Sequence, residues 1–106
     1  MDAAPDERIE LCSVEDVAEG TVKKVEAGDL ELAVYNLDGV FYVTDEHCTH
    51  GPGEMSEGEI HGDLIECNFH GGMFNIKTGE VAGPPCMSPI RAYRTVVEEG
   101  KVFILL

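Results

Sequence analysis

The chain has 106 residues, of which 43% are hydrophobic, and this length and composition suit one folded domain rather than a disordered chain. Its 21 acidic residues against 7 basic ones give a formal net charge of −14, which disfavours binding to nucleic acid or to anionic lipid. No apolar run approaches the ~20 residues that cross a bilayer, and the acidic start over 1–10 is no secretion signal, so we expect no membrane contact and a cytoplasmic protein.

Four short runs in the N-terminal half are rich in β-branched, aromatic and alternating apolar residues, which is typical of β-strands. We expect strands over residues 9–13, 21–25, 30–36 and 40–44. The last two runs are separated by Leu37-Asp38-Gly39, and the Asp-Gly pair is a strong signal for a tight turn. The sequence therefore predicts a hairpin over residues 30–44.

The middle of the chain, residues 45–90, has a different character. It holds four of the five prolines and most of the glycines, and it contains no pattern for a long helix. After it, residues 93–98 and 101–105 flank Glu99-Gly100 and predict a second hairpin. We therefore expect one all-β domain over residues 1–106 with a loop-rich insertion at about 45–90.

Two cysteine–histidine pairs lie in this loop-rich segment, namely Cys48-Thr49-His50 and Cys67-Asn68-Phe69-His70. Sixteen residues separate His50 from Cys67, and a glycine that permits positive φ follows each histidine (Gly51 and Gly71). A single pair of this kind is weak evidence for a metal site. Two pairs on glycine-rich loops are harder to explain by packing, because histidine is a poor core residue that needs a polar partner when it is buried.

The two pairs can be read as ligands for either of two metal centres. Two thiolates and two imidazoles can bind tetrahedral zinc, and a zinc-binding interaction module of all-β shape stays an alternative. Zinc sites usually pair cysteine with cysteine and histidine with histidine, however, whereas each pair here is mixed. Mixed pairs favour a two-iron cluster in which two cysteines hold one iron and two histidines hold the other, because each loop then gives one ligand to each iron.

The string Cys48-Thr49-His50-Gly51 followed by Cys67-x-x-His70-Gly71 resembles the Rieske [2Fe–2S] ferredoxin family. It is most similar to the small ferredoxins of bacterial aromatic-ring-hydroxylating dioxygenase systems. The resemblance covers about residues 8–105 and includes flanking similarities at residues 38–45, 55–58, 74–75, 78–79 and 83–85. It implies a Rieske-like fold of stacked antiparallel sheets with a loop-rich cluster-binding subdomain at about 45–90. It also implies one [2Fe–2S] cluster per chain, ligated by Cys48, His50, Cys67 and His70.

The resemblance further implies an electron-transfer component rather than an enzyme. Such a ferredoxin accepts one electron from a flavin-dependent reductase and passes it to a terminal aromatic-ring-hydroxylating oxygenase. We expect a monomer whose acidic surface favours a basic partner, although that charge can also serve solubility alone. The other alternative is a Rieske subunit of a different redox enzyme, such as a nitrite reductase.

The resemblance also predicts a low reduction potential. High-potential members of the family carry an additional cysteine in each loop, and a serine and a tyrosine that donate to the cluster sulfurs. At the corresponding positions this chain has Gly53 and Phe69, and then Gly72 and Phe74. None of these side chains donates a hydrogen bond, so we expect less stabilisation of the added electron and a potential near the lower end of the Rieske range.

The remaining cysteines and histidines are expected to play other parts. Cys12 is expected to be a small buried residue on a strand, and Cys86 has no assigned partner. His47 and His61 are not expected to bind metal, and His61 is expected in a turn beside Gly62. An apolar docking rim is expected around the histidine ligands, formed by Pro52, Phe69 and Pro85.

Overall fold

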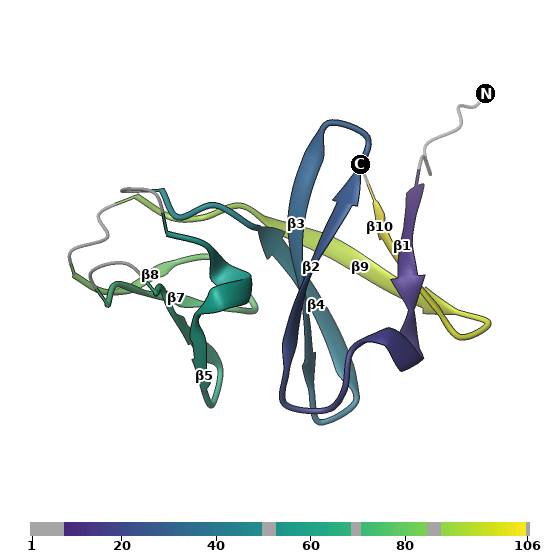
Figure 1. The fold of residues 1–106 in the computed structure, drawn as a ribbon, viewed down its shortest axis with the longest axis horizontal. Coiled ribbons are helices and arrows are strands. Elements are labelled where there is room, and N and C mark those ends of the chain that lie inside the picture. Colours follow the sequence, from purple (N-terminus) through teal and green to yellow (C-terminus); the bar gives the residue numbers. More distant parts are fainter. Residues whose placement is uncertain (1–7, 50–52, 69–70, 85–87, 106) are drawn as a thin grey trace.

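The computed structural model describes residues 8–49, 53–68, 71–84 and 88–105, which form two antiparallel β-sheets (Figure 1). In the order of hydrogen-bonded neighbours, the large sheet contains β1 (Arg8–Ser13), β10 (Lys101–Leu105), β9 (Ala92–Glu98), β4 (Val40–Asp45), β3 (Leu30–Leu37) and β2 (Val22–Ala27). The small sheet contains β5 (Glu59–His61), β6 (Leu64–Glu66), β7 (Met73–Asn75) and β8 (Val81–Gly83). Two single-turn 3₁₀ helices, η1 (Val14–Asp16) and η2 (Met55–Glu57), complete the elements. The predicted all-β fold of antiparallel sheets is confirmed.

The described ranges hold no helix that is long and apolar enough to cross a bilayer. The cytoplasmic location stays a prediction. The small sheet falls within the insertion predicted over 45–90, and the bounds of that insertion and of the domain also stay predictions.

The large sheet consists of two three-stranded halves that meet along a short seam. β4 and β9 pair only through Val43 with Tyr93 and Thr44 with Ala92. Side chains from both halves form one apolar core: Val17, Leu32, Val34, Phe41, Val43, Tyr93, Val102 and Ile104. The large sheet therefore has its own core, separate from the one that supports the small sheet.

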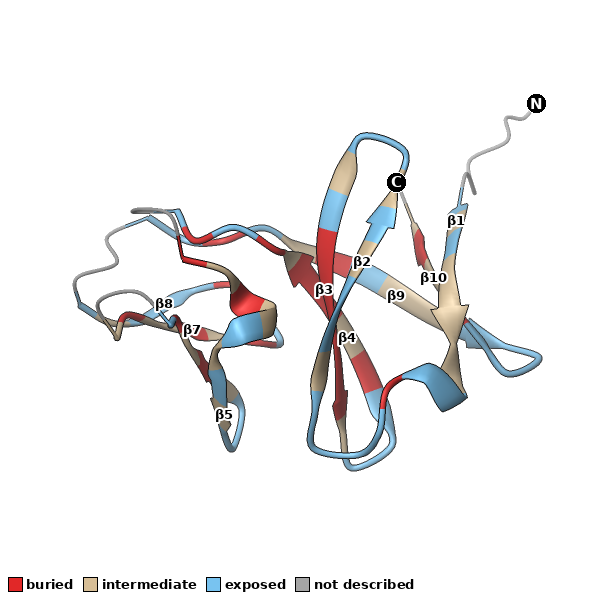
Figure 2. Cartoon of the chain, in the orientation of Figure 1, coloured by how far each residue is buried: buried red, intermediate tan, exposed pale blue. Residues whose placement is uncertain are grey.

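Strand β3 is buried on both faces, which places it between the two cores (Figure 2). Leu32 and Val34 lie in the core of the large sheet, whereas Ala33 and Tyr35 face the small sheet. Side chains alternate between the faces of a strand, so each core receives every second residue of β3. This double burial explains why the run over 32–35 is continuously apolar instead of alternating with polar residues.

Both predicted hairpins are confirmed, and their turns have the backbone that the sequence indicated. Asp38 and Gly39 have φ of +56° and +87°, while Glu99 and Gly100 have +52° and +77°. Two consecutive residues with positive φ form the two-residue hairpin turn whose twist matches that of the flanking strands. These turns fix the strand register of the two hairpins, with Leu37 opposite Val40 and Glu98 opposite Lys101.

The small sheet is the main difference from the sequence-based expectation, which placed loops there. Each of its strands has only three residues, too few for a periodic pattern to emerge. Ile65 and Phe74 are opposite one another on β6 and β7, and both are fully buried. His61 was expected in a turn and is instead the last residue of β5, beside the turn that contains Gly62.

Candidate metal centre

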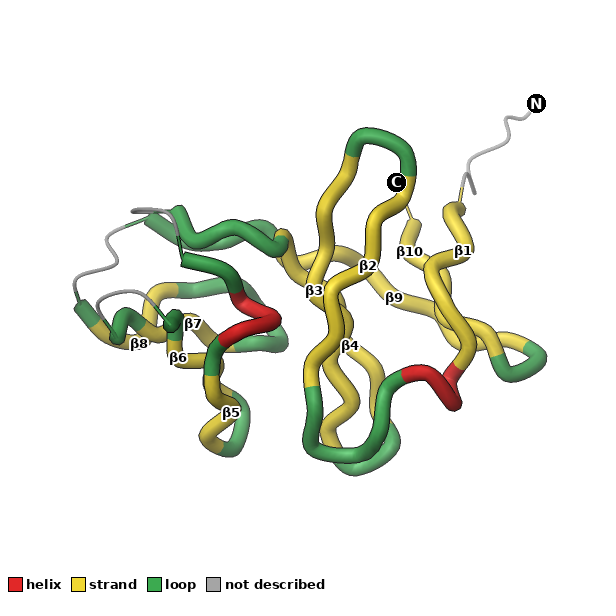
Figure 3. Tube along the Cα trace, viewed as in Figure 1, coloured by secondary structure: helices red, strands yellow, loops and turns green. Residues whose placement is uncertain are grey.

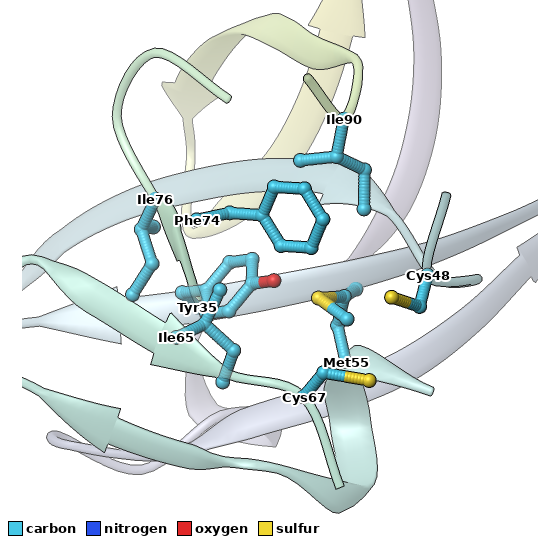
Figure 4. Close-up of a cluster of buried hydrophobic side chains, with 9 residues drawn as sticks. Tyr35, Cys48, Met55, Ile65, Cys67, Phe74, Ile76 and Ile90 are labelled. Carbon is cyan, nitrogen blue, oxygen red and sulfur yellow. The ribbon is translucent and has the colours of Figure 1, made fainter. Parts of the chain in front are cut away.

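Cys48 and Cys67 are brought together by the two sheets. Cys48 follows the end of β4 by three residues, and Cys67 follows β6 directly. Both belong to the core that supports the small sheet, with exposed fractions of 7% and 2%. Their sulfur atoms lie at the same end of that core, next to Met55 (Figure 4). The other two predicted ligands, His50 and His70, lie outside the described residues.

Each of the two cysteine loops is closed by a backbone hydrogen bond of the same type. The N–H of Cys48 donates to the carbonyl of Gly53 at 2.9 Å, and the N–H of Cys67 donates to the carbonyl of Gly72 at 2.6 Å. Each bond joins a cysteine to the residue five positions later, so each loop has four residues at its tip. Gly71 has φ of +72°, as the sequence predicted for the glycine that follows a histidine. In the sequence, the predicted ligands His50 and His70 fall within these two four-residue stretches.

Further hydrogen bonds connect the loops with one another and with the segment before β9. The N–H of Glu54 donates to Oδ1 of Asn68 at 2.9 Å, which joins the first loop to the second. The hydroxyl of Thr49 donates to the carbonyl of Ser88 at 2.8 Å. The loops are therefore fixed relative to one another by polar contacts as well as by the core below them.

The core beneath the loops consists of buried, mainly apolar side chains. It contains, besides the two cysteines, the buried residues Ala33, Tyr35, Met55, Ile65, Phe74, Ile76 and Ile90 (Figure 4). The Tyr35 hydroxyl shares a 2.8 Å hydrogen bond with Oγ1 of Thr44, and burial raises the pKa of Tyr35 well above its ordinary value. Phe74 is fully buried in this core, and its side chain offers no hydroxyl.

Glu46 is a buried residue that the sequence did not single out. Its side chain is fully buried, and its two carboxylate oxygens accept hydrogen bonds from the backbone N–H and from the hydroxyl of Ser56. Burial raises the pKa of Glu46, and the two hydrogen bonds from Ser56 oppose that rise. No pattern marks the residue in advance, because a glutamate in a loop-rich acidic segment reads as solvent-exposed.

The two histidines that were not expected to bind metal pair with carboxylates. Nε2 of His47 contacts Oε1 of Glu31, and this hydrogen bond is the main reason why the pKa of Glu31 is lowered. Nε2 of His61 lies 2.9 Å from Oε1 of Glu66. Cys12 carries a free, half-buried thiol on β1, so the expectation of a buried residue is met only in part. Burial, followed by the charge of nearby Asp16, raises the pKa of that thiol.

Comparison with known proteins assigns this centre to a family. The chain matches the family model of the Rieske [2Fe-2S] domain over residues 7–94. It belongs to the Rieske [2Fe–2S] family. Among curated proteins it is 42% identical over 97 residues to ferredoxin CarAc of Metapseudomonas resinovorans, which covers 91% of both chains.

Solved structures agree with this assignment. The fold matches a Sphingomonas yanoikuyae B1 ferredoxin with a TM-score of 0.89 and 42% identity, over 94% of this chain and 99% of that one. It matches a chain in a complex of reduced oxygenase and oxidized ferredoxin of carbazole 1,9a-dioxygenase with a TM-score of 0.86 and 41% identity, over 92% of each chain. A structure described as a nitrite reductase small subunit has a TM-score of 0.80 at 19% identity, which shows a shared fold alone.

The residues of this structure fit the cofactor of the family, one [2Fe–2S] cluster per chain. Two soft cysteine sulfurs lie at one end of a buried apolar core, on two loops that have the same backbone closure and are hydrogen-bonded to each other. The family membership favours the iron–sulfur interpretation over the zinc module that the sequence left open. The predicted Rieske-like fold is likewise confirmed.

Proposed function

We propose that this chain is the ferredoxin component of an aromatic-ring-hydroxylating dioxygenase system. In this role it accepts one electron at a time from a flavin-dependent reductase and passes it to a terminal oxygenase. The observation that carries the proposal is the pair of buried cysteine sulfurs at the end of one core, in a chain whose relatives of similar length are ferredoxins. A p-cumate 2,3-dioxygenase ferredoxin component of Pseudomonas putida, for example, is 40% identical over 96 residues.

The four proposed ligands are Cys48 and Cys67 for one iron and His50 and His70 for the other. When bound, the cluster supplies a site that takes up and releases a single electron. The protein holds the cysteines in position through the two loop closures and excludes water through the core below. A reaction on an organic substrate takes place elsewhere, and this chain is an electron carrier rather than an enzyme.

We further propose a low reduction potential for this centre. The buried Phe74 ring belongs to the same core as Cys48 and Cys67 and has no hydrogen-bond donor. Fewer donors to the cluster sulfurs leave the added electron less stabilised, so the potential falls toward the lower end of the roughly −150 to +300 mV Rieske range. A low potential suits a carrier that is reduced by a flavin. The alternative, a nitrite reductase subunit, is supported only by a shared fold, and the monomeric state stays a prediction.

The first experiment is anaerobic purification followed by analysis of iron, acid-labile sulfide and the visible and EPR spectra. We expect about two irons and two sulfides per chain, bleaching by dithionite, and a reduced EPR signal whose average g is below the free-electron value. The variants Cys48→Ser and His50→Ala should each lose most of the cluster, whereas Cys12→Ser should keep it. One zinc per chain in place of iron would contradict the proposal.

The second experiment tests which partner accepts the electron from the reduced protein and at what potential. The reduced protein should be reoxidised by the terminal oxygenase of an aromatic dioxygenase system in the presence of its substrate, and its midpoint potential should lie below zero. Reoxidation by a nitrite reductase but by no aromatic oxygenase would favour the alternative. A potential well above zero would contradict the low-potential assignment.

A further inference from the structure

The base of the first cysteine loop is built like the end of a hairpin. The carbonyl of Glu46 accepts from the N–H of Met55 at 2.7 Å, His47 and Glu54 form a bridge, and the N–H of Cys48 donates to Gly53. These three successive backbone pairings bring the two ends of the loop together. The pairing nearest to β4 is that of Glu46 with Met55, so any opening of the loop at its base must separate these two residues.

The Glu46 side chain adds a second connection across the same pairing. Its Oε1 accepts from the backbone N–H of Ser56 at 3.0 Å, and its Oε2 accepts from the Ser56 hydroxyl. On its other side, the backbone N–H of Glu46 donates to the carbonyl of Glu31 on β3 at 3.0 Å. Glu46 thus joins three parts of the fold, namely the large sheet, the first cysteine loop and helix η2.

The burial of this carboxylate needs a reason, because glutamate is among the residues least often buried. Glu46 has an exposed fraction of 0%, and the hydrogen bonds that the structure gives its carboxylate come from the neutral donors of Ser56. An apolar residue of similar size would avoid the cost of removing this group from water. The carboxylate does, however, accept two directed hydrogen bonds at once, which an apolar side chain cannot do.

We propose that Glu46 is a positioning residue for the metal centre, whose buried carboxylate clamps the base of the first loop through Ser56 and so fixes Cys48. Glu46 and Cys48 are both buried, while the His47 side chain between them is exposed, so the clamp and the cysteine face the same interior. The inference rests on the proposed [2Fe–2S] function and deepens it. A cluster held by a loosened Cys48 should be lost sooner and should show altered electronic properties.

Ser56 gives the sharpest test, because it can be changed without altering charge. Ser56→Ala removes the hydroxyl bond, and Ser56→Thr keeps a hydroxyl and should restore the clamp. Glu46→Gln keeps the size of the side chain but leaves one acceptor oxygen instead of two. Ile104→Val, in the core of the large sheet, serves as a control that lowers overall stability without touching the loop.

Cluster loss to a chelator, amide hydrogen exchange and the reduced EPR spectrum are the three measurements. In Ser56→Ala and Glu46→Gln we expect cluster loss to be about tenfold faster, faster exchange at the N–H groups of Cys48 and Met55, and shifted or broadened g values. Ser56→Thr should behave as the unchanged protein. In the double variant of Ser56→Ala and Glu46→Gln, the acceleration of cluster loss should be smaller than the two single effects combined, since both changes break the same contact.

Two results would overturn the clamp. One is that Ser56→Ala and Glu46→Gln match the unchanged protein in cluster loss and exchange. The other is that Ile104→Val causes the same cluster loss and EPR change, which would assign the effect to general stability. If the unchanged protein binds no [2Fe–2S] cluster, the proposed function fails, and hydrogen exchange at Cys48 and Met55 still decides whether the clamp exists.

Discussion

Tyr93 and Asp45 form a side-chain contact beside the short seam of the large sheet. The Tyr93 hydroxyl donates to Oδ1 of Asp45 at 2.6 Å, close to the seam where β9 and β4 share only two residue pairs. Burial, followed by the hydrogen bond to Asp45, raises the pKa of Tyr93 to about 12. Arg91 lies over the same ring at 4.5 Å and favours the ionised form. The neutral phenol therefore stabilises the folded state.

This contact predicts a loss of stability in strong base. The folded pKa of Tyr93 is raised above the unfolded value of about 10, so its contribution is complete below pH ~10 and is lost as pH rises toward 12. We expect the free energy of unfolding to fall by up to about 2 kcal/mol over this window through Tyr93. Urea unfolding at stepped pH should show a shallower decline in Tyr93→Phe. An identical decline in both proteins would exclude Tyr93 as the cause.

Single residues also show where sequence-based interpretation stops. The spacing of Cys48 and Cys67 was informative because thiols on glycine-rich loops have few structural roles, and both are found in one core. The burial of Glu46 was not predicted, because it depends on β3 and on Ser56, which lies ten residues further along the chain. A charged residue is recognised as buried only when the elements that cover it are in place.

At the level of elements, the turn after β7 depends on a glycine in two ways. Gly79 has φ of +82°, and a Cβ there would lie 2.0 Å from the carbonyl oxygen of Ile90. The carbonyl of Gly79 also accepts from the N–H of Ile90 at 2.8 Å, which joins this turn to the segment before β9. The backbones approach too closely for any side chain, so the turn and that segment pack only with glycine at this position.

We therefore predict that Gly79→Ala is more damaging than the same change at another positive-φ glycine. Gly28, in the turn between β2 and β3, has φ of +62° and no neighbour within 4 Å of a built Cβ. Gly28→Ala should cost about 1–2 kcal/mol of unfolding free energy from backbone strain alone, whereas Gly79→Ala should cost about 3 kcal/mol or more. Equilibrium urea unfolding measures both. Equal losses would mean that the close approach to Ile90 does not matter.

On the scale of the whole molecule, the dominant electrostatic feature is the net charge of −14. Close to the metal centre, the acidic side chains of Glu57, Glu59 and Glu66 line a surface cleft of about 310 Å³ together with Cys67. An acidic surface beside the metal centre is expected to speed the encounter with a basic partner at low salt. The expected apolar rim of Pro52, Phe69 and Pro85 lies outside the described residues.

Charge reversal tests whether this local field matters for electron transfer. In Glu57→Lys we expect the second-order rate of reduction by the reductase to fall severalfold at low ionic strength and to depend less on salt. Glu15→Lys, on η1 at the far end of the molecule, changes net charge equally and should have a smaller effect (Figure 3). Equal effects of the two changes would mean that the rate of reduction depends on the net charge alone and not on the local field.

The sequence by itself determined the local parts of this protein. Both hairpins were predictable, because Asp38-Gly39 and Glu99-Gly100 adopt turns that few other sequences favour. The type of cofactor was predictable, since cysteine and histidine in mixed pairs suit few chemistries, whereas the four ligands stay a prediction. These features depend on neighbours within a few residues, which is the range over which sequence patterns carry information.

Only the tertiary structure decided how the local parts combine. The three-residue strands β6 and β7 place Ile65 and Phe74 in the same core as Ala33 and Tyr35 of β3, whereas Leu32 and Val34 of β3 face the other core. The hydrogen bond from Glu54 to Asn68 and the burial of Glu46 between Glu31 and Ser56 likewise arise from contacts between separate segments. Such contacts gain their free energy from burial that no short stretch of chain can provide alone, so no local sequence pattern predicts them.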